Sequence, residues 1–173
     1  MSIKYNPSII VADDEPDILE TISDIVETFH PHVLRANDGQ EALDLFKANR
    51  VSCIISDINM PRLNGLNFLK EIRNLGFETP VIFVTAHTEK KMVIEAFRLG
   101  ATDYIEKPFD IDQLLGLVKQ THELGIAILD MEDELKEIVA HSKLSESKIK
   151  KFKECKKAVR LMSIENEKRR KAS

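Results

Sequence analysis

Five polar residues stand at the ends of segments of this sequence that are expected to form strands. The first of these segments runs into two adjacent carboxylates within the stretch IIVADDEP, and three later ones lead to an aspartate, a threonine and a lysine. Neighbouring carboxylates repel one another, and water stabilises each of them better than an apolar core does. A group of such residues at one place in a fold therefore needs a compensating cation. The five residues are Asp13, Asp14, Asp57, Thr85 and Lys107.

These residue types together favour phosphoryl chemistry. Three carboxylates in one pocket do not all stay ionised without a cation, and oxygen ligands in a shallow, hydrated site suit Mg²⁺. Lys107 would add a fixed positive charge, and the Thr85 hydroxyl would add a hydrogen-bond donor. Metal and ammonium can then neutralise the oxygens of a phosphoryl group carried by Asp57. Each residue alone is better explained as a helix cap or a solvated loop charge; their joint occurrence favours the phosphoryl site.

The elements that must position these residues alternate between strand and helix. Apolar runs predict strands at residues 8–12, 51–56 and 81–84, and the shorter segments 33–36 and 103–106 are expected to be two further strands. Between them, apolar residues recur at helical spacing, with Pro16 in a first turn and a capping box that begins at Asp38. Continuously apolar strands are typical of a parallel sheet covered on both faces. We therefore expect an α/β fold with a five-stranded, parallel, doubly wound sheet of flavodoxin-like order, whose strand ends share one edge.

Four stretches resemble the receiver domain of bacterial two-component response regulators: VADDEPDIL, CIISDINMPRLNGLNFL, VIFVTAH and GATDYIEKPF. The resemblance covers roughly residues 6–122. It implies that Asp57 is the phosphoacceptor for a sensor histidine kinase. It also implies that Mg²⁺ is bound directly by Asp14, largely through water by Asp13, and by the backbone carbonyl of Asn59. Such a phosphoprotein catalyses its own aspartyl phosphorylation and dephosphorylation, and is not otherwise expected to be an enzyme.

The same resemblance implies how phosphorylation is communicated. Lys107 would pair with Asp57 or its phosphate, and Pro108 would follow a cis peptide bond. Thr85 would turn inward to the phosphate, and Tyr104 would follow into the space vacated.

This movement would alter the surface formed by the helix over 92–99, the strand over 103–106 and the helix that begins after Asp110. Asn59 and His87 would flank the phosphate and tune its hydrolysis.

Three other classes of protein were compared with this pattern. A phosphatase of the haloacid dehalogenase type would need a second aspartate two residues after its nucleophile, where Asn59 stands. A flavodoxin would need a Ser/Thr/Gly-rich loop after the first strand to bind the FMN phosphate, whereas the acidic loop here repels a bare phosphate. A pseudo-receiver adaptor that never carries phosphate shares the fold and remains open, although the complete set of five polar residues argues against it.

The last part of the chain has a different composition. Residues 143–173 contain 12 Lys and Arg against 4 Asp and Glu, a net charge of +8, which leaves −12 for the first 142 residues. We expect a receiver domain over residues 1–122 and a helical extension over residues 123–173. An apolar repeat with 3-4 spacing predicts that the fifth helix continues to about Ala140 as a coiled-coil seam, with a kink at Gly125 as one possibility. The repeat comprises Leu114, Leu117, Thr121, Leu124, Ile128, Met131, Leu135 and Ile138.

We expect this extension to form a homodimer or to dock a partner protein, with a linker to an output domain as an alternative. Binding to nucleic acid is disfavoured because Phe152 is the one aromatic residue among the basic residues. The stretch QTHELG is similar to the phosphoacceptor helix of histidine-kinase dimerisation domains, which would make His122 part of a phosphotransfer-like hairpin. The usual basic-Thr-Pro continuation is absent, which favours His122 as an ordinary surface residue.

Length and composition place the chain among ordinary globular proteins. Its 173 residues suffice for one domain with an appendage, and 43% hydrophobic with 31% charged residues is typical of that class. The two cysteines do not suggest a disulfide framework. No apolar run approaches the roughly 20 residues of a membrane span. We therefore expect a cytoplasmic protein.

Overall fold

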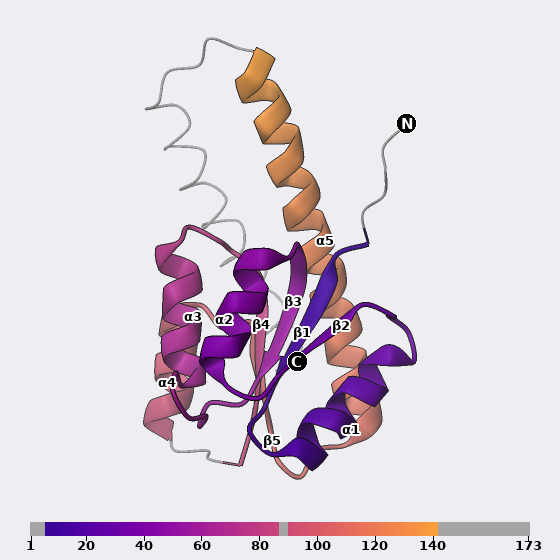
Figure 1. The fold of residues 1–173 in the computed structure, drawn as a ribbon, viewed down its shortest axis with the longest axis vertical. Coiled ribbons are helices and arrows are strands. Elements are labelled where there is room, and N and C mark those ends of the chain that lie inside the picture. Colours follow the sequence, from indigo (N-terminus) through magenta and orange to yellow (C-terminus); the bar gives the residue numbers. More distant parts are fainter. Residues whose placement is uncertain (1–5, 87–89, 142–173) are drawn as a thin grey trace, which may run out of the picture. The chain divides into compact units, whose positions relative to one another are not determined.

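The computed structural model describes residues 6–86 and 90–141, with side chains up to residue 138 (Figure 1). The described residues form five strands that alternate with five helices. The strands are β1 (Ser8–Ala12), β2 (Val33–Ala36), β3 (Val51–Ser56), β4 (Val81–Thr85) and β5 (Asp103–Glu106). The helices are α1 (Pro16–Glu27), α2 (Gly39–Ala48), α3 (Gly65–Asn74), α4 (Lys90–Leu99) and α5 (Ile111–His141).

The strands form one parallel sheet in the order β2-β1-β3-β4-β5. Ile10 of β1 lies opposite Ile54 of β3, and Ile54 lies opposite Val81 of β4. This order and direction confirm the predicted doubly wound, flavodoxin-like sheet. Because all strands point the same way, the residues that follow them meet at a single edge.

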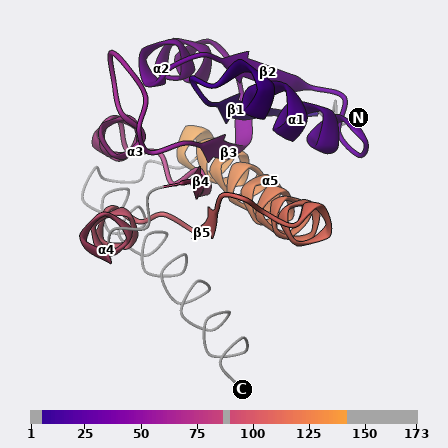
Figure 2. The same cartoon turned by 90° about the horizontal axis from the view of Figure 1, so that it is seen from below.

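The helices cover both faces of the sheet. Seen along the strands, α1 and α5 lie on one face, and α2, α3 and α4 lie on the other (Figure 2). Successive residues of a strand point to opposite faces, so Ile10 enters the core beneath α2 and α3 while Ile9 and Val11 enter the core beneath α1 and α5. Both cores exclude water, which is why the central strands are apolar throughout.

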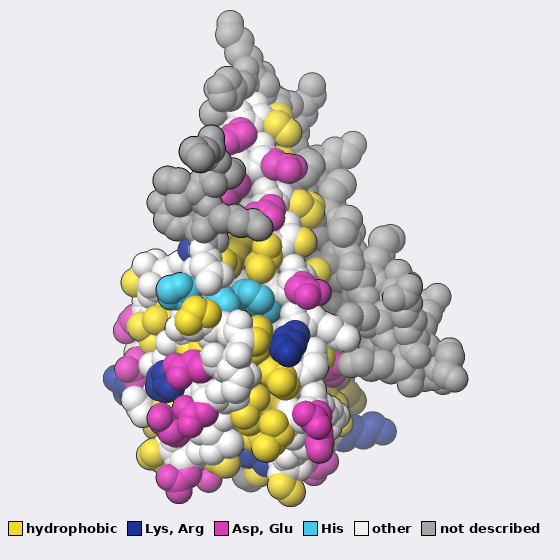
Figure 3. Space-filling model, turned by 90° about the vertical axis from the view of Figure 1, so that its right-hand side faces the viewer, with side chains coloured by type: hydrophobic (Ala, Val, Ile, Leu, Met, Phe, Trp, Pro, Cys, Tyr) yellow, Lys and Arg dark blue, Asp and Glu magenta, His cyan; other side chains and the backbone are white. Residues whose placement is uncertain are grey.

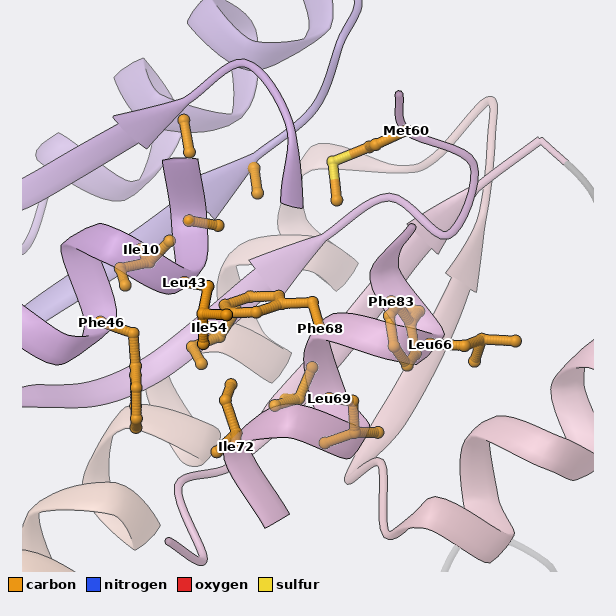
Figure 4. Packing of buried hydrophobic residues seen from close by; sticks show 14 of the residues in the cluster. Ile10, Leu43, Phe46, Ile54, Met60, Leu66, Phe68, Leu69, Ile72 and Phe83 are labelled. Atoms are coloured by element: carbon orange, nitrogen blue, oxygen red, sulfur yellow. The ribbon is translucent and has the colours of Figure 1, made fainter. Parts of the chain in front are cut away.

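The core beneath α2 and α3 is built around aromatic side chains. Phe68 of α3 and Phe83 of β4 are fully buried, and Figure 4 shows them among the aliphatic side chains of β1, β3 and α2. Leu69 and Ile72 follow Phe68 at helical spacing and bury the same face of α3. This packing fixes α3 against the sheet directly behind the loop that leaves β3.

Side chains close the first turns of two helices as predicted. The Asp38 carboxylate accepts hydrogen bonds from the backbone N–H of Gln40 and Glu41, at 2.8 and 3.0 Å. The Glu41 carboxylate accepts a hydrogen bond from the backbone N–H of Asn37 at 2.9 Å. In a standard capping box it would accept from the next residue, the N-cap Asp38. At the start of α5, the Asp110 carboxylate accepts from the backbone N–H of Gln113 at 2.8 Å.

Helix α5 continues to His141, which confirms the predicted extension to about residue 140. The chain divides into two compact units between Ala127 and Ile128, so that α5 begins in the first unit and ends in the second. The expected boundary at residues 122/123 remains a prediction. Within the described residues, no helix is long and apolar enough to cross a membrane.

The first half of α5 buries a different face from the one that its 3-4 repeat suggested. Leu114 and Thr121 belong to that repeat but lie in the core of the first unit, where they are not available to a seam between chains. Leu117 and Leu124 are only half-buried. The prediction of one continuous seam from Leu114 is therefore wrong, because up to residue 125 the helix packs on its own sheet. The fully buried face comprises Leu114, Val118, Thr121, His122 and Gly125.

Candidate functional site

The residues predicted to do chemistry meet at the carboxyl edge of the sheet. Asp13 follows β1, Asp57 follows β3, Thr85 ends β4 and Lys107 follows β5. Asp13, Asp57 and Thr85 are buried, whereas Asp14 is exposed. The sequence prediction that these five side chains share one edge agrees with the structure.

Three carboxylates form a group that could hold a metal ion. One oxygen from each of Asp13, Asp14 and Asp57 lies within 4.8 Å of the others. The donor set consists of oxygen atoms, which hard divalent cations prefer. Exposure of Asp14 leaves one side of the group open to water, and Mg²⁺ usually keeps several water ligands in protein sites. The residues present therefore fit Mg²⁺.

Lys107 supplies the positive charge of the site. Its Nζ lies 2.7 Å from Asp13 Oδ2, 3.1 Å from Glu15 Oε1 and 3.5 Å from Asp57 Oδ2. The peptide bond between Lys107 and Pro108 is cis, as the resemblance implied. Glu15 was not predicted as a site residue, although it belongs to the same acidic stretch as Asp13. The lysine thus connects the acidic loop after β1 with the candidate phosphoacceptor after β3.

Burial and charge act in opposite directions on this ion pair. Burial raises the pKa of the Asp13 carboxyl above its ordinary value, and the hydrogen bond from Lys107 offsets part of that rise. Burial acts to lower the pKa of Lys107, but the hydrogen bond to Asp13, the charge of Asp57 and the hydrogen bond to Glu15 outweigh it, so that this pKa is raised. Lys107 therefore stays an ammonium group at neutral pH. Burial destabilises the ionised form of Asp13, and a bound cation would stabilise it.

The loop after β3 fixes the orientation of the Asp57 carboxylate. Oδ1 accepts a hydrogen bond from the backbone N–H of Ile58 at 2.6 Å and a longer one from that of Asn59 at 3.4 Å. The backbone N–H of Asp57 donates to the Ala12 carbonyl at 2.8 Å, which ties the loop to the end of β1. With Oδ1 held by the backbone, Oδ2 is the oxygen on the side of Lys107.

Gly65 allows α3 to begin directly against the candidate phosphoacceptor. A Cβ atom at this position would lie 2.1 Å from the Asp57 carbonyl oxygen and 2.9 Å from the Phe83 ring. The Gly65 N–H instead donates to the Ile58 carbonyl at 2.8 Å. Sequence reasoning noted this glycine as part of a motif, but its reason is the close approach of two backbone segments.

The two predicted switch residues lie on neighbouring strands and differ in exposure. Thr85 is fully buried, and its backbone carbonyl accepts a hydrogen bond from the Lys107 N–H at 2.9 Å. Tyr104 has 36% of its surface exposed, and its ring packs edge-on against Phe97 of α4 at a centroid distance of 6.2 Å. Asn59 is exposed beside the site. The predicted tuning residue His87 lies outside the described residues.

The prediction that His122 is a surface residue is wrong. Only 8% of it is exposed, and its Nδ1 lies 2.7 Å from the Ser52 hydroxyl, near the amino end of β3. Asp57 follows the opposite end of that strand, so His122 takes no part in the acidic site. A phosphotransfer histidine has to be accessible to a partner, and a ring buried against the sheet is not.

The match to known proteins covers the same part of the chain. A family model described as the response regulator receiver domain matches residues 9–119. The regulatory protein AtoC of Escherichia coli is 38% identical over 118 residues, which are 67% of this chain and 25% of AtoC. The transcriptional regulatory protein DltR of Streptococcus agalactiae is 35% identical over 111 residues, 64% of this chain and 50% of DltR. This chain thus spans a quarter to a half of these relatives.

A solved structure shows the same arrangement of strands and helices. The receiver domain of the Francisella response regulator 1452 superposes with a TM-score of 0.63 at 36% identity. The superposition covers 68% of this chain and 98% of that domain. The family match over residues 9–119 includes the three carboxylates and Lys107.

Proposed function

This chain belongs to the response regulator receiver family, and from that premise we propose that it accepts a phosphoryl group on Asp57 from a sensor histidine kinase. The observation that carries the proposal is the convergence of three carboxylates and one buried ammonium group at the carboxyl edge of the sheet. A carboxylate oxygen of Asp57 forms a bond to phosphorus while the bond from phosphorus to the donor breaks. Hydrolysis of the resulting acyl phosphate by water returns the free carboxylate.

Each site residue has a distinct part in this proposal. Asp13, Asp14 and Asp57 would hold Mg²⁺ together with the Asn59 carbonyl, and bound Mg²⁺ supplies charge neutralisation for the phosphoryl oxygens. Lys107 is already 3.5 Å from Asp57 Oδ2 and adds the second positive charge. In this proposal these residues act on the chain's own carboxylate and not on a separate substrate.

The exposure of the switch residues supports the proposed output. Thr85 is fully buried and Tyr104 is 36% exposed, so Tyr104 has exposed surface to lose in the inward movement that the family resemblance implies. Tyr104 packs on Phe97, so its movement changes the surface formed by α4, β5 and α5. Phosphorylation at one edge of the sheet would thereby reach a surface that a partner can bind.

Labelling by a small phosphodonor tests the proposed phosphorylation. Incubation of the full chain with acetyl phosphate and Mg²⁺ is expected to give a hydroxylamine-labile phosphoryl group, because Asp57 needs the cation to approach a phosphate. Chelation of Mg²⁺ is expected to prevent labelling. Wild-type protein that is never labelled would support the phosphate-independent adaptor, and labelling that continues without Mg²⁺ would refute the proposed role of the acidic group.

We also propose that the second half of α5 pairs two chains. Met131 and Ile138 are 36% and 55% exposed and lie on one helical face with Ile128 and Leu135. Light scattering of the full chain is expected to give the mass of a dimer. When a phosphate mimic is bound, we expect a change in this mass or in the hydrogen-exchange protection of the C-terminal tail.

The variant Ile138→Glu is expected to shift this equilibrium toward the monomer, because a carboxylate cannot be buried in an apolar seam without cost. Leu75→Glu changes a leucine after α3 that is 49% exposed and is the matched control. A monomeric mass for the wild type, with and without the mimic, would exclude pairing through this helix.

A further inference from the structure

Histidines gather at the amino end of the sheet, on the opposite edge from Asp57. His30 follows α1, His32 precedes β2 and His122 belongs to α5, and Figure 3 shows the histidine side chains beside hydrophobic ones on one face of the molecule. The ring centroids of His30 and His122 are 4.5 Å apart, and those of His30 and His32 are 5.9 Å apart. His30 and His122 are buried, whereas His32 is exposed.

The hydrogen bonds of the buried pair define where a further proton would bind. His30 Nε2 lies 2.8 Å from the Pro7 carbonyl oxygen, which can only accept, so this nitrogen carries the hydrogen and Nδ1 is the basic one. His122 Nδ1 lies 2.7 Å from the Ser52 hydroxyl, which can donate or accept. Each neutral ring therefore has one hydrogen-bond partner.

The charged groups around the pair do not favour protonation. In addition to burial, His32, which precedes β2, contributes to the lower pKa of His30, and His30 contributes to the lower pKa of His122. From α5, the Lys119 ammonium lies 5.5 Å above the Phe29 ring, which packs edge-on against His122. Pro7 before β1 and Ser52 of β3 contribute a carbonyl and a hydroxyl group. The carboxylate next to His122 in sequence, that of Glu123, is exposed.

Burial accordingly shifts the titration of both rings. Burial, together with the nearby His30, lowers the pKa of His122 to about 4. Burial also lowers the pKa of His30, although the hydrogen bond to the Pro7 carbonyl opposes the shift. A histidine whose folded pKa is depressed contributes stability that is complete above its unfolded pKa of about 6.5 and is lost as the pH falls toward the folded value.

The same contact holds α5 to the sheet close to the end of the first unit. A Cβ atom on Gly125 would lie 1.7 Å from the Ser52 carbonyl oxygen, so the helix backbone rests directly on Ser52. His122, one turn earlier, binds the hydroxyl of the same serine. The second unit begins three residues after Gly125, at Ile128. Ser52 is therefore the anchor of the last turns of α5 within the first unit.

We propose that the His30–His122 pair is an acid-sensitive latch, which holds α5 on Ser52 while both rings are neutral and releases residues 121–127 when the pair is protonated. A positive charge on one buried ring repels a charge on the other at 4.5 Å, and neither has a carboxylate partner among the groups described above. The latch acts at the root of the helical extension and does not depend on phosphorylation of Asp57.

Hydrogen exchange of the full chain at a series of pH values tests the latch. The protection factors of amides 121–127 are expected to fall below about pH 6, by up to about tenfold per pH unit for each proton bound. The variant His122→Phe keeps a ring of similar size without a titratable group, and its protection is expected to fall less steeply than that of the wild type, because of the pair only His30 can then bind a proton. His32→Gln removes the exposed histidine and is expected to follow the wild type.

A wild-type protection profile that is unchanged down to about pH 4.5 would overturn the latch, as would an equally steep fall in His122→Phe. Histidine proton resonances of the wild type give a second measurement, which does not depend on the folding of any variant. Two histidines are expected to titrate below the ordinary range in step with the loss of protection in 121–127. The proposal would likewise be overturned if all described histidines titrated in the ordinary range. Asp57→Asn is expected to leave the pH profile of protection in 121–127 unaltered.

Discussion

Alanine in place of Gly125 is expected to lower the free energy of unfolding by about 2 kcal/mol or more, because the helix has to move away from the sheet. The added Cβ would meet the Ser52 carbonyl oxygen at 1.7 Å and its carbon at 2.6 Å, and neither backbone atom can turn aside as a side chain would. Alanine is otherwise the better helix former by about 1 kcal/mol, so the clash has to exceed that gain. Urea unfolding followed by circular dichroism measures the difference.

Gly116→Ala is the matched control for this substitution. Gly116 lies in the same helix, is exposed and has no atom within 4 Å of the position of an added Cβ. This variant is expected to be more stable than the wild type by up to about 1 kcal/mol. The two alanines should thus have effects of opposite sign. A Gly125→Ala variant as stable as Gly116→Ala would show that α5 does not rest on Ser52.

Methionine in place of Lys107 is expected to impair both stability and phosphorylation. Removal of one partner from a buried ion pair leaves the other charge uncompensated, and we expect a loss of about 3 kcal/mol in the free energy of unfolding. Asp13 is the partner that loses its 2.7 Å contact. Without the ammonium group near Asp57, labelling by acetyl phosphate is expected to slow by roughly a hundredfold. Unfolding curves and the rate of labelling measure the two effects separately.

The pH dependence of this variant identifies Asp13 as the uncompensated group. Burial already raises the pKa of Asp13, and loss of Lys107 raises it further. A carboxyl whose folded pKa lies above its unfolded value destabilises the protein as the pH rises. The loss of unfolding free energy in Lys107→Met should therefore be smaller near about pH 4.5 than near about pH 7.5. Lys136→Met, at an exposed surface pair with Asp133, is the control and should change stability by less than about 0.5 kcal/mol. An equal loss in both lysine variants would contradict the buried ion pair.

The fold was predictable because its sequence signals are local and agree with one another. Continuous apolar runs such as that of β3 are needed when both faces of a strand are covered, and the polar residues that end them mark the sheet edge. The parallel order then brings Asp13, Asp57 and Lys107 together without further information. Contacts between side chains of separate loops, such as that of Glu15 with Lys107, were not predictable from spacing alone.

The burial of His122 was missed although a signal was present. Leu114, Val118 and His122 follow one another at intervals of four residues, and Thr121 and Gly125 lie on the same helical face. The prediction instead followed the apolar side chains at 3-4 spacing, which lie on a neighbouring face of the helix, because a histidine and a glycine carry little hydrophobic signal. Their position is set by long-range packing on Ser52, which is 70 residues away from His122 in the sequence.

Locating the phosphoryl group within the chain is the most direct test of the central claim. After labelling with acetyl phosphate and Mg²⁺, borohydride reduction converts an aspartyl phosphate to homoserine, which mass spectrometry of peptides assigns to one residue. The account predicts homoserine at position 57 and none in Asp57→Asn. Homoserine at position 13 or 14, or phosphoryl label that persists in Asp57→Asn, would contradict it.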